Sequence, residues 1–218
     1  MSSIASRLQE VLSTLRKGVE LVAVSKTKPI EDIQEAYDAG QRDFGENKIQ
    51  EMASKWEALP NDIRWHMIGH VQTNKVKYMA AFVHLVHGVD RDKVLQELDK
   101  QAAKAGRIVD CTLQVHIAME ETKFGYDASE LAEVIGRLNE FPNVRVVGLM
   151  GMATNTDDMA LVRKEFSALR ELFVHYGEER GWSVLSMGMS GDYIEAMECG
   201  STHVRIGSAI FGARNYAL

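Results

Sequence analysis

Short apolar runs alternate along the chain with longer stretches in which apolar residues recur every three or four positions. Runs of the first kind predict strands, stretches of the second kind predict helices, and their regular alternation is typical of βα units in a parallel sheet. The pattern predicts eight strands, over Glu20–Ser25, Asp43–Gly45, Arg64–Gly69, Phe82–Val86, Asp110–Ile117, Arg145–Met150, Ser183–Met187 and His203–Ile206.

Helices are predicted between these strands, and one more precedes the first strand. Pro29 and Gly40 bracket the second helix, because proline suits the first helical turn and glycine suits the residue that follows the last. The predicted helices are Ile4–Lys17, Ile30–Ala39, Asn47–Glu57, Asn74–Ala81, Asp92–Ala105, Asp127–Asn139, Asp158–Tyr176 and Gly191–Cys199, with a short closing helix over Ser208–Gly212.

Eight βα units form either an open doubly wound sheet or a closed barrel, and periodicity alone does not distinguish them. Two features favour the barrel: no GxGxxG opens a helix after the first strand, and polar residues follow many of the strands rather than meeting at one crevice. We therefore predict a (β/α)8 TIM barrel with an extra N-terminal helix, forming a single domain over residues 1–218.

The composition is that of an ordinary globular protein of 218 residues, 45% hydrophobic and 26% charged. A net charge of −6, without a run of five basic residues, argues against a nucleic-acid partner. No apolar stretch reaches about 18 residues, so no membrane span is expected. Cys111 and Cys199 lie outside any CxxC pair, which fits reduced thiols and a cytoplasmic location.

Lys26 ends the apolar run that begins at Leu21 and is followed by Thr27-Lys28-Pro29. A lysine where a buried strand opens into a loop is partly desolvated, which favours the neutral amine that attacks carbonyl groups. Lys26 is therefore a candidate Schiff-base lysine. Taken alone, the segment also fits a solvated lysine at the end of a strand.

Two loops near the C-terminus carry small residues from a strand into a helix, namely Gly188–Asp192 and Gly207–Ala209. Ser190 is predicted to be the N-cap of the first of these helices. Phosphate usually binds after strands seven and eight of such a barrel, where backbone N–H groups and helix dipoles favour an anion. Each loop alone fits an ordinary tight βα turn equally well.

Arg205 on the last predicted strand adds a cation. An arginine inside a barrel needs a partner, and a bound ligand is one candidate. Among cofactors, pyridoxal phosphate (PLP) requires this combination of a lysine for its aldehyde, a phosphate cup, and a charged residue near its pyridine nitrogen.

Several motifs match those of a known family. They are Ala23–Pro29, Phe44–Asn47, Trp65–Lys75, Gln114–Ile117 with Lys123–Gly125, Gly148–Met150, and the two C-terminal loops. Together they span essentially the whole chain, and it resembles the pyridoxal phosphate homeostasis proteins, single-domain relatives of the alanine racemase barrel. The departures are small: Val71 stands where leucine is expected, and His70 occupies a variable position.

The resemblance implies a cofactor site made of Lys26, Asn47, Met189, Ser190, Arg205, Gly207 and Ser208. In this site Lys26 holds PLP as a Schiff base and Arg205 faces the pyridine nitrogen. The two C-terminal loops ring the phosphate, and Asn47 lies near the cofactor.

The expected function is non-catalytic. An arginine opposite the pyridine nitrogen keeps that nitrogen unprotonated and the ring a poor electron sink. Alanine racemases also take a second base from a separate domain, whereas this sequence stops at Leu218, directly after the eighth unit. We expect a monomeric protein that supplies or buffers PLP, with other B6 vitamers and PLP-dependent apo-enzymes as further partners.

Two alternatives stay open. One is a small PLP-dependent racemase or lyase, with Lys28, Lys75, His66 or Lys123 as a base near the mouth of the barrel. The other is a phosphate-recognising barrel in which Lys26 only pairs with an anion. A metal site is not expected, because His84 and His87 are three apart on a predicted strand and should face opposite sides.

Overall fold

The computed structural model describes residues 2–120 and 124–212. Within them, eight parallel strands close into a barrel in chain order, because β1 pairs with β2 on one side and with β8 on the other. The strands are β1 (Glu20–Val24), β2 (Asp43–Glu46), β3 (Arg64–Met67), β4 (Leu85–Val89), β5 (Val109–Gln114), β6 (Val144–Met150), β7 (Val184–Met189) and β8 (His203–Ile206). The predicted (β/α)8 barrel is confirmed.

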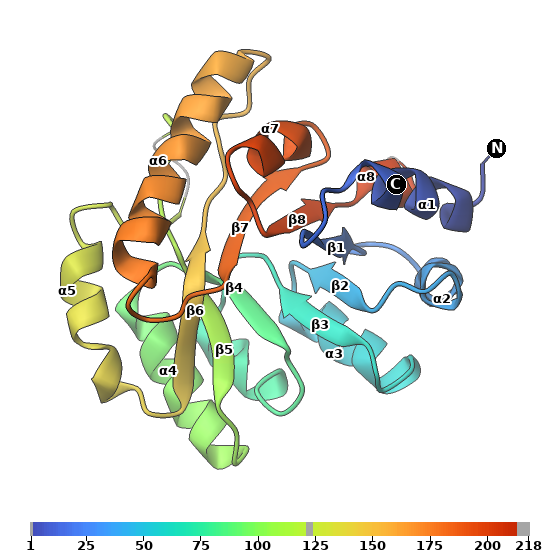
Figure 1. Cartoon of the computed structure of the whole chain (residues 1–218). Helices are drawn as coiled ribbons and strands as arrows, with labels where there is room; N and C mark the ends of the chain where they lie inside the picture. Colours follow the sequence, from blue (N-terminus) through green and yellow to red (C-terminus); the bar gives the residue numbers. More distant parts are fainter. Residues whose placement is uncertain (1, 121–123, 213–218) are drawn as a thin grey trace.

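Helices surround the barrel (Figure 1). They are α1 (Ile4–Thr14), α2 (Ile30–Asp38), α3 (Ile49–Ala58), the 3-10 helix η1 (Thr73–Tyr78), α4 (Asp92–Lys104), α5 (Leu131–Gly136), the 3-10 helix η2 (Leu138–Glu140), α6 (Met159–Gly177), α7 (Tyr193–Glu198) and α8 (Ser208–Phe211). The extra N-terminal helix α1 packs beside the short α8. Among the described helices, none is both long and apolar enough to cross a membrane.

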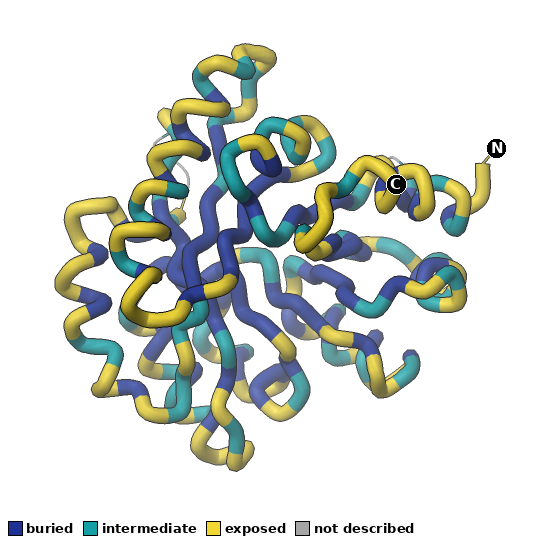
Figure 2. The backbone as a smooth tube through the Cα atoms, viewed as in Figure 1, coloured by how far each residue is buried: buried dark blue, intermediate teal, exposed yellow. Residues whose placement is uncertain are grey.

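The buried residues lie where a closed barrel places them, in the strands and on the inner sides of the helices. Most strand residues are buried, and the exposed residues lie mainly on the outer sides of the helices and in the loops (Figure 2). The longer helices contribute apolar stripes to the layer between helices and strands, as Leu8 of α1 and Leu98 of α4 illustrate with no exposed surface. Since the packed barrel is rigid, the loops after its strands have a fixed frame from which to build a site.

The predicted boundaries are wrong around the fourth strand. That strand was predicted over Phe82–Val86 but runs over Leu85–Val89. The N–H groups of Phe82 and Val83 both donate to the Met79 carbonyl, which makes this stretch a turn after η1. Because the apolar run is continuous here, alternation could not locate where the strand begins. The helix predicted over Asp127–Asn139 similarly divides into α5 and η2.

Candidate functional site

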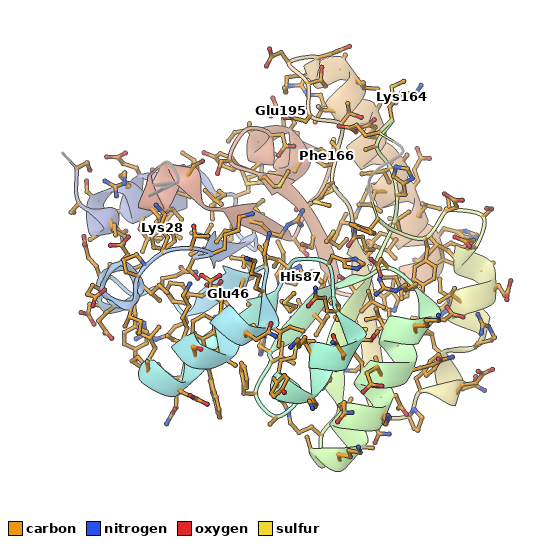
Figure 3. All side chains as sticks on the ribbon, turned by 180° about the vertical axis from the view of Figure 1, so that it is seen from behind. Lys28, Glu46, His87, Lys164, Phe166 and Glu195 are labelled. Atoms are coloured by element: carbon orange, nitrogen blue, oxygen red, sulfur yellow. The ribbon has the colours of Figure 1, made fainter. Side chains whose placement is uncertain are left out.

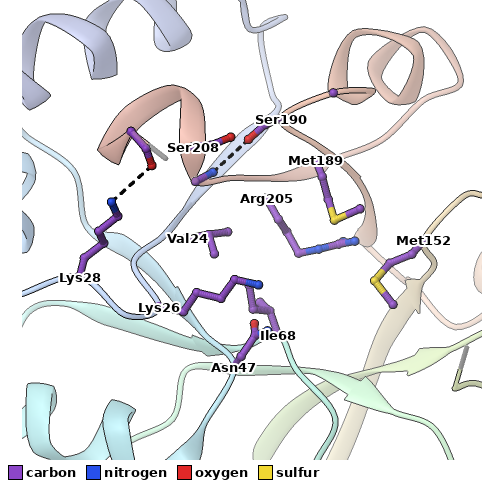
Figure 4. A pocket seen from close by; sticks show the side chains of 13 residues that line it. Val24, Lys26, Lys28, Asn47, Ile68, Met152, Met189, Ser190, Arg205 and Ser208 are labelled. Carbon is purple, nitrogen blue, oxygen red and sulfur yellow. Dashed lines mark hydrogen bonds between the residues drawn. The ribbon is translucent and has the colours of Figure 1, made fainter. Parts of the chain in front are cut away.

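A cavity of about 320 Å³ lies at the carboxyl ends of the barrel strands. It is lined by residues at the ends of six strands, β1, β2, β3, β6, β7 and β8, and brings together the whole predicted cofactor set: Lys26, Asn47, Met189, Ser190, Arg205, Gly207 and Ser208. Figure 4 shows the side chains of Lys26 and Arg205 extending into the same space from different strands. The sequence-predicted residues therefore share one pocket, although their individual roles stay predictions.

Lys26 lies in a tight turn directly after β1. The N–H of Lys28 donates to the Ser25 carbonyl at 3.0 Å, and Thr27 between them has a φ of 63°. A β-branched residue rarely adopts this left-handed conformation, so the turn is strained. The Thr27 N–H donates to Glu51 Oε1 at 2.6 Å, which anchors the turn to α3 and holds Lys26 at the cavity.

A buried polar network lies beneath this turn. Ser25 Oγ donates to Glu46 Oε1 at 2.6 Å, and the Lys55 ammonium donates to that same oxygen and to the Ser25 carbonyl, each at 2.8 Å. Glu46, labelled in Figure 3, has no exposed surface, and its Oε2 atom has no hydrogen-bond partner among the described residues. Burial raises the pKa of Glu46 to about 7, against the lowering effects of Lys55 and Ser25. The base of the Lys26 turn therefore carries a carboxyl group that titrates near neutral pH.

The two C-terminal loops are joined across the cavity. Ser190 Oγ accepts a hydrogen bond from the Gly207 N–H at 3.3 Å (Figure 4). The prediction that Ser190 is a helix N-cap is wrong, because Asp192 occupies the N-cap position of α7. Asp192 Oδ1 instead accepts from the Met189 N–H at 2.5 Å. The Ser190 hydroxyl thus joins the two loops rather than capping the N-terminus of α7.

The backbone of these loops requires glycine at Gly188 and leaves little room for a side chain at Gly207. Gly188 has a φ of +95°, and a Cβ there would lie 2.6 Å from the Ala196 Cβ. A Cβ at Gly207 would lie 3.1 Å from the Val24 carbonyl oxygen. The N–H groups of Ser208 and Ala209 have no acceptor within α8, because they belong to its first turn. Close backbone approach and available N–H donors suit an anion between the loops.

Arg205 on β8 is 3% exposed. Its Nη1 donates to Ser186 Oγ at 2.5 Å and its Nη2 donates to the Gly151 carbonyl at 3.2 Å, so both described hydrogen bonds go to neutral acceptors. Burial lowers the pKa of Arg205 to about 10, which leaves the guanidinium charged at neutral pH. The cavity therefore has a buried cation on one wall.

Further residues line the cavity without having been predicted as cofactor ligands: Val24, Lys28, Ile68, Met152, Gly191 and Gly212. Lys28 Nζ donates to the carbonyls of Phe211 at 2.8 Å and Gly212 at 3.3 Å, which ties the β1 loop to the end of α8. The signal that could have identified Ile68 and Met152 was their position at or just after strand ends, but apolar residues there carry no chemical signature.

The four candidate bases have separate positions. Lys28 lines the cavity, and Lys75 lines a neighbouring cavity that shares Asn47. Lys123 lies outside the described residues. The prediction that His66 lies near the mouth is wrong, because it lines a cavity of about 510 Å³ among the amino ends of the strands, which we call the floor cavity.

The prediction that His84 and His87 face opposite sides is also wrong. Their rings lie 5.3 and 5.2 Å from the ring of His66. His84 precedes β4 rather than belonging to it, so strand alternation does not relate the two. Ligand atoms of Asp43, His66 and His84 lie within 4.8 Å of one another. Arg64 pairs with both carboxylate oxygens of Asp43, however, and this cation opposes a metal ion at the same position.

Comparison with known proteins places the chain among relatives of similar length. The family model for the alanine racemase N-terminal domain matches residues 1–215. The chain is 40% identical over 222 residues to the pyridoxal phosphate homeostasis protein of Aquifex aeolicus (strain VF5), covering 99% of this chain and 97% of that protein. It is 39% identical over 236 residues to the protein of the same name from Vibrio alginolyticus, covering 100% of both.

Solved structures of related proteins have the same fold. PipY of Synechococcus elongatus PCC7942, without PLP, matches with a TM-score of 0.91 and 34% identity over 96% of this chain and 100% of that one, and the PLP-bound PipY structure matches with a TM-score of 0.87. An alanine racemase of Clostridium difficile 630 shares the fold at 11% identity and a TM-score of 0.81, and 58% of its chain is covered. These matches define the fold class as the alanine racemase N-terminal barrel. Within that class, the chain belongs to the family of pyridoxal phosphate homeostasis proteins, as its motifs predict.

Proposed function

We propose that this protein binds PLP in the cavity at the mouth of the barrel and supplies or buffers it, with little or no turnover. The observation that carries the proposal is the convergence of Lys26, the buried Arg205 and two joined serine- and glycine-containing loops on a single cavity of about 320 Å³. A cavity of this size lies within the range of small-molecule sites. PLP-bound PipY, 34% identical, supports the assignment of the ligand.

The donor set suits each part of this ligand. PLP supplies an aldehyde, which condenses with a lysine amine to a Schiff base and releases water. In our assignment Lys26 would hold that carbon, and Arg205 would donate to the pyridine nitrogen. Met189 with Ser190 and Gly207 with Ser208 would hold the phosphate, with hydroxyls and first-turn N–H groups as donors. Asn47 lines the wall beside Lys26.

A carrier role fits the chemistry of Arg205. An arginine is a hydrogen-bond donor only, so it holds the pyridine nitrogen as an acceptor and leaves the ring a weak electron sink. The relatives matched over nearly their full lengths are named as homeostasis proteins. We propose a monomeric cytoplasmic protein that exchanges PLP, and other B6 vitamers, with PLP-dependent apo-enzymes.

A racemase or lyase is the second candidate, because the Lys28 ammonium lines the same cavity. Incubating the PLP-loaded protein with single amino acids in deuterated water separates the two functions. Sustained incorporation of deuterium at the α-carbon identifies an enzyme. Without it, the carrier proposal stands.

Titration with PLP, followed by absorbance, tests the binding assignment. We expect a bound-cofactor band with the wild-type chain, its loss in Lys26→Ala, and its retention in Lys48→Ala, which removes an exposed lysine beside Asn47 but outside the cavity. Equal binding by Lys26→Ala and the wild type would overturn the assignment of Lys26.

A further inference from the structure

A continuous line of hydrogen-bonded side chains runs through the barrel, from the cavity that Arg205 lines to the floor cavity. Arg205 Nη1 donates to Ser186 Oγ at 2.5 Å, and His87 Nδ1 lies 2.8 Å from that hydroxyl. His87 Nε2 lies 2.9 Å from His66 Nδ1, and His66 Nε2 lies 3.0 Å from Asp43 Oδ1. Since Arg205 lines the cofactor cavity and Asp43 lines the floor cavity, this line connects them.

The middle of the line is closed to solvent. Ser186 and His87 have no exposed surface and His66 is 1% exposed, and Figure 3 shows His87 inside the barrel. Buried polar groups cost free energy unless each finds a partner, so every bond in the line matters to its neighbours. TIM barrels fill this space with layers of branched apolar side chains, whereas this barrel places polar groups there.

The two ends fix the direction of each bond. A guanidinium only donates and a carboxylate only accepts. A neutral imidazole has one donor and one acceptor nitrogen. With both histidines neutral, one arrangement therefore satisfies the line: Arg205 donates to Ser186, Ser186 to His87 Nδ1, His87 Nε2–H to His66 Nδ1, and His66 Nε2–H to Asp43. Both histidines then carry their hydrogen on Nε2.

The charges at and along the line agree with this arrangement. Burial lowers the pKa of His87 well below its usual range, which keeps that ring neutral. Burial alone would raise the pKa of Asp43, but hydrogen bonds from His66 and Arg64 lower it well below its usual range. At neutral pH the line thus has a donor, Arg205, at the cofactor cavity and an acceptor, the Asp43 carboxylate, at the floor cavity.

We propose that Ser186, His87, His66 and Asp43 are positioning residues that hold the Arg205 guanidinium toward the cofactor cavity through a hydrogen-bond chain of fixed direction. Arg205 has five N–H groups, so the bonds to Ser186 and Gly151 orient it while leaving donors for a ligand. The floor cavity is thereby linked to the ligand contact at the opposite end of the barrel. This inference rests on the proposed PLP site.

The first test uses the ligand-free protein and does not depend on PLP. Two-bond ¹⁵N–¹H correlation spectra at neutral pH report which nitrogen of each histidine carries hydrogen. We expect the Nε2–H form for His87 and His66 in the wild type, and the same forms in Ser186→Ala, because Asp43 still accepts from His66 Nε2–H and His66 Nδ1 still accepts from His87 Nε2–H. The Nδ1–H form of His87 in the wild type would overturn the proposed direction.

The second test measures the rate at which PLP dissociates into an excess of an acceptor apo-enzyme. Ser186→Ala should release PLP about tenfold faster, since one buried bond to a charged group is lost. Ser186→Thr keeps the hydroxyl and should restore the wild-type rate to within about twofold. Thermal melts of both variants confirm that they fold.

Two matched variants at the floor cavity test whether the far end of the hydrogen-bond chain affects PLP release. Asp43→Asn should speed release roughly threefold, because its single carbonyl must serve both Arg64 and His66. Asp110 also lines the floor cavity, but its described side-chain hydrogen bonds come from Arg145 and not from the proposed chain of residues. Asp110→Asn should therefore leave the release rate unchanged. If both Ser186→Ala and Asp43→Asn release PLP at the wild-type rate, the proposed hydrogen-bond chain is overturned while the PLP site is left intact. A wild-type protein that does not bind PLP would instead overturn the proposed function.

Discussion

Ser190 and Gly207 are joined by a hydrogen bond of 3.3 Å, from the Gly207 N–H to the Ser190 hydroxyl, and this bond links the loop after β7 to the loop after β8. Two loops that rest on neighbouring strands are thereby held at a fixed spacing around one cavity.

Removing this hydroxyl should loosen the proposed phosphate cup. We expect Ser190→Ala to bind PLP about three- to tenfold more weakly, because one neutral hydrogen bond and one ligand donor are lost. Isothermal titration at constant salt measures the change, with pyridoxal, which lacks the phosphate, as the matched ligand. Equal losses for PLP and pyridoxal would contradict a role for Ser190 at the phosphate.

Glu46 should make stability depend on pH. Its pKa of about 7 in the folded chain exceeds the ordinary value of 4.5, so the folded state binds the proton more tightly. This contribution is complete below pH 4.5 and is lost as the pH rises through 7, by at most about 3 kcal/mol. Urea unfolding of the wild type and Glu46→Gln across this range isolates it. A stability difference that is constant from pH 4.5 to 7.5 would contradict the raised pKa.

The strain at Thr27 should be measurable as stability. Asparagine adopts left-handed backbone angles more readily than threonine, so Thr27→Asn should raise the free energy of unfolding by about 1 kcal/mol. Thr27→Ala removes the β-branch but keeps a Cβ in the same backbone conformation, and it should gain less. Chemical denaturation compares the three proteins, and a less stable Thr27→Asn would show that the turn is not strained.

Two glycines in the same loop should respond differently to one added methyl group. Gly188→Ala would place a Cβ 2.6 Å from the Ala196 Cβ at a positive φ, and we expect a loss of about 2 kcal/mol or more. A Cβ at Gly191 meets no atom within 4 Å, so Gly191→Ala should be close to neutral. Similar thermal midpoints for the two variants would contradict the close packing of β7 against α7.

The number and order of the strands could be predicted because each βα unit changes its hydrophobic period. The start of β4 could not, since a continuous apolar run from Phe82 offers no alternation, and hydrogen bonds to Met79 decide where the turn ends. Ser190 followed the N-cap pattern, but it bonds to Gly207, a partner 17 residues away that a local pattern cannot show.

The polar residues that line the cavity at the mouth of the barrel were easier to find in the sequence than those of the barrel interior. Lys26 and Arg205 are polar residues beside or within apolar strands, which makes them conspicuous in the sequence. His66 and His87 have the same property, but their contact joins β3 to β4 and depends on register. Register between parallel strands is set by packing across the whole barrel, so the hydrogen-bond chain becomes visible only in three dimensions.

We propose above all that the Lys26 amine holds the PLP aldehyde. Reduction with borohydride in the presence of PLP, followed by proteolysis and mass spectrometry, tests it most directly, with Lys26→Ala as the control. We predict one stable pyridoxyl adduct, on Lys26, with none on Lys28 and no adduct in the variant. An adduct on another lysine with Lys26 unmodified, or no adduct at saturating PLP, would contradict a Schiff base at Lys26.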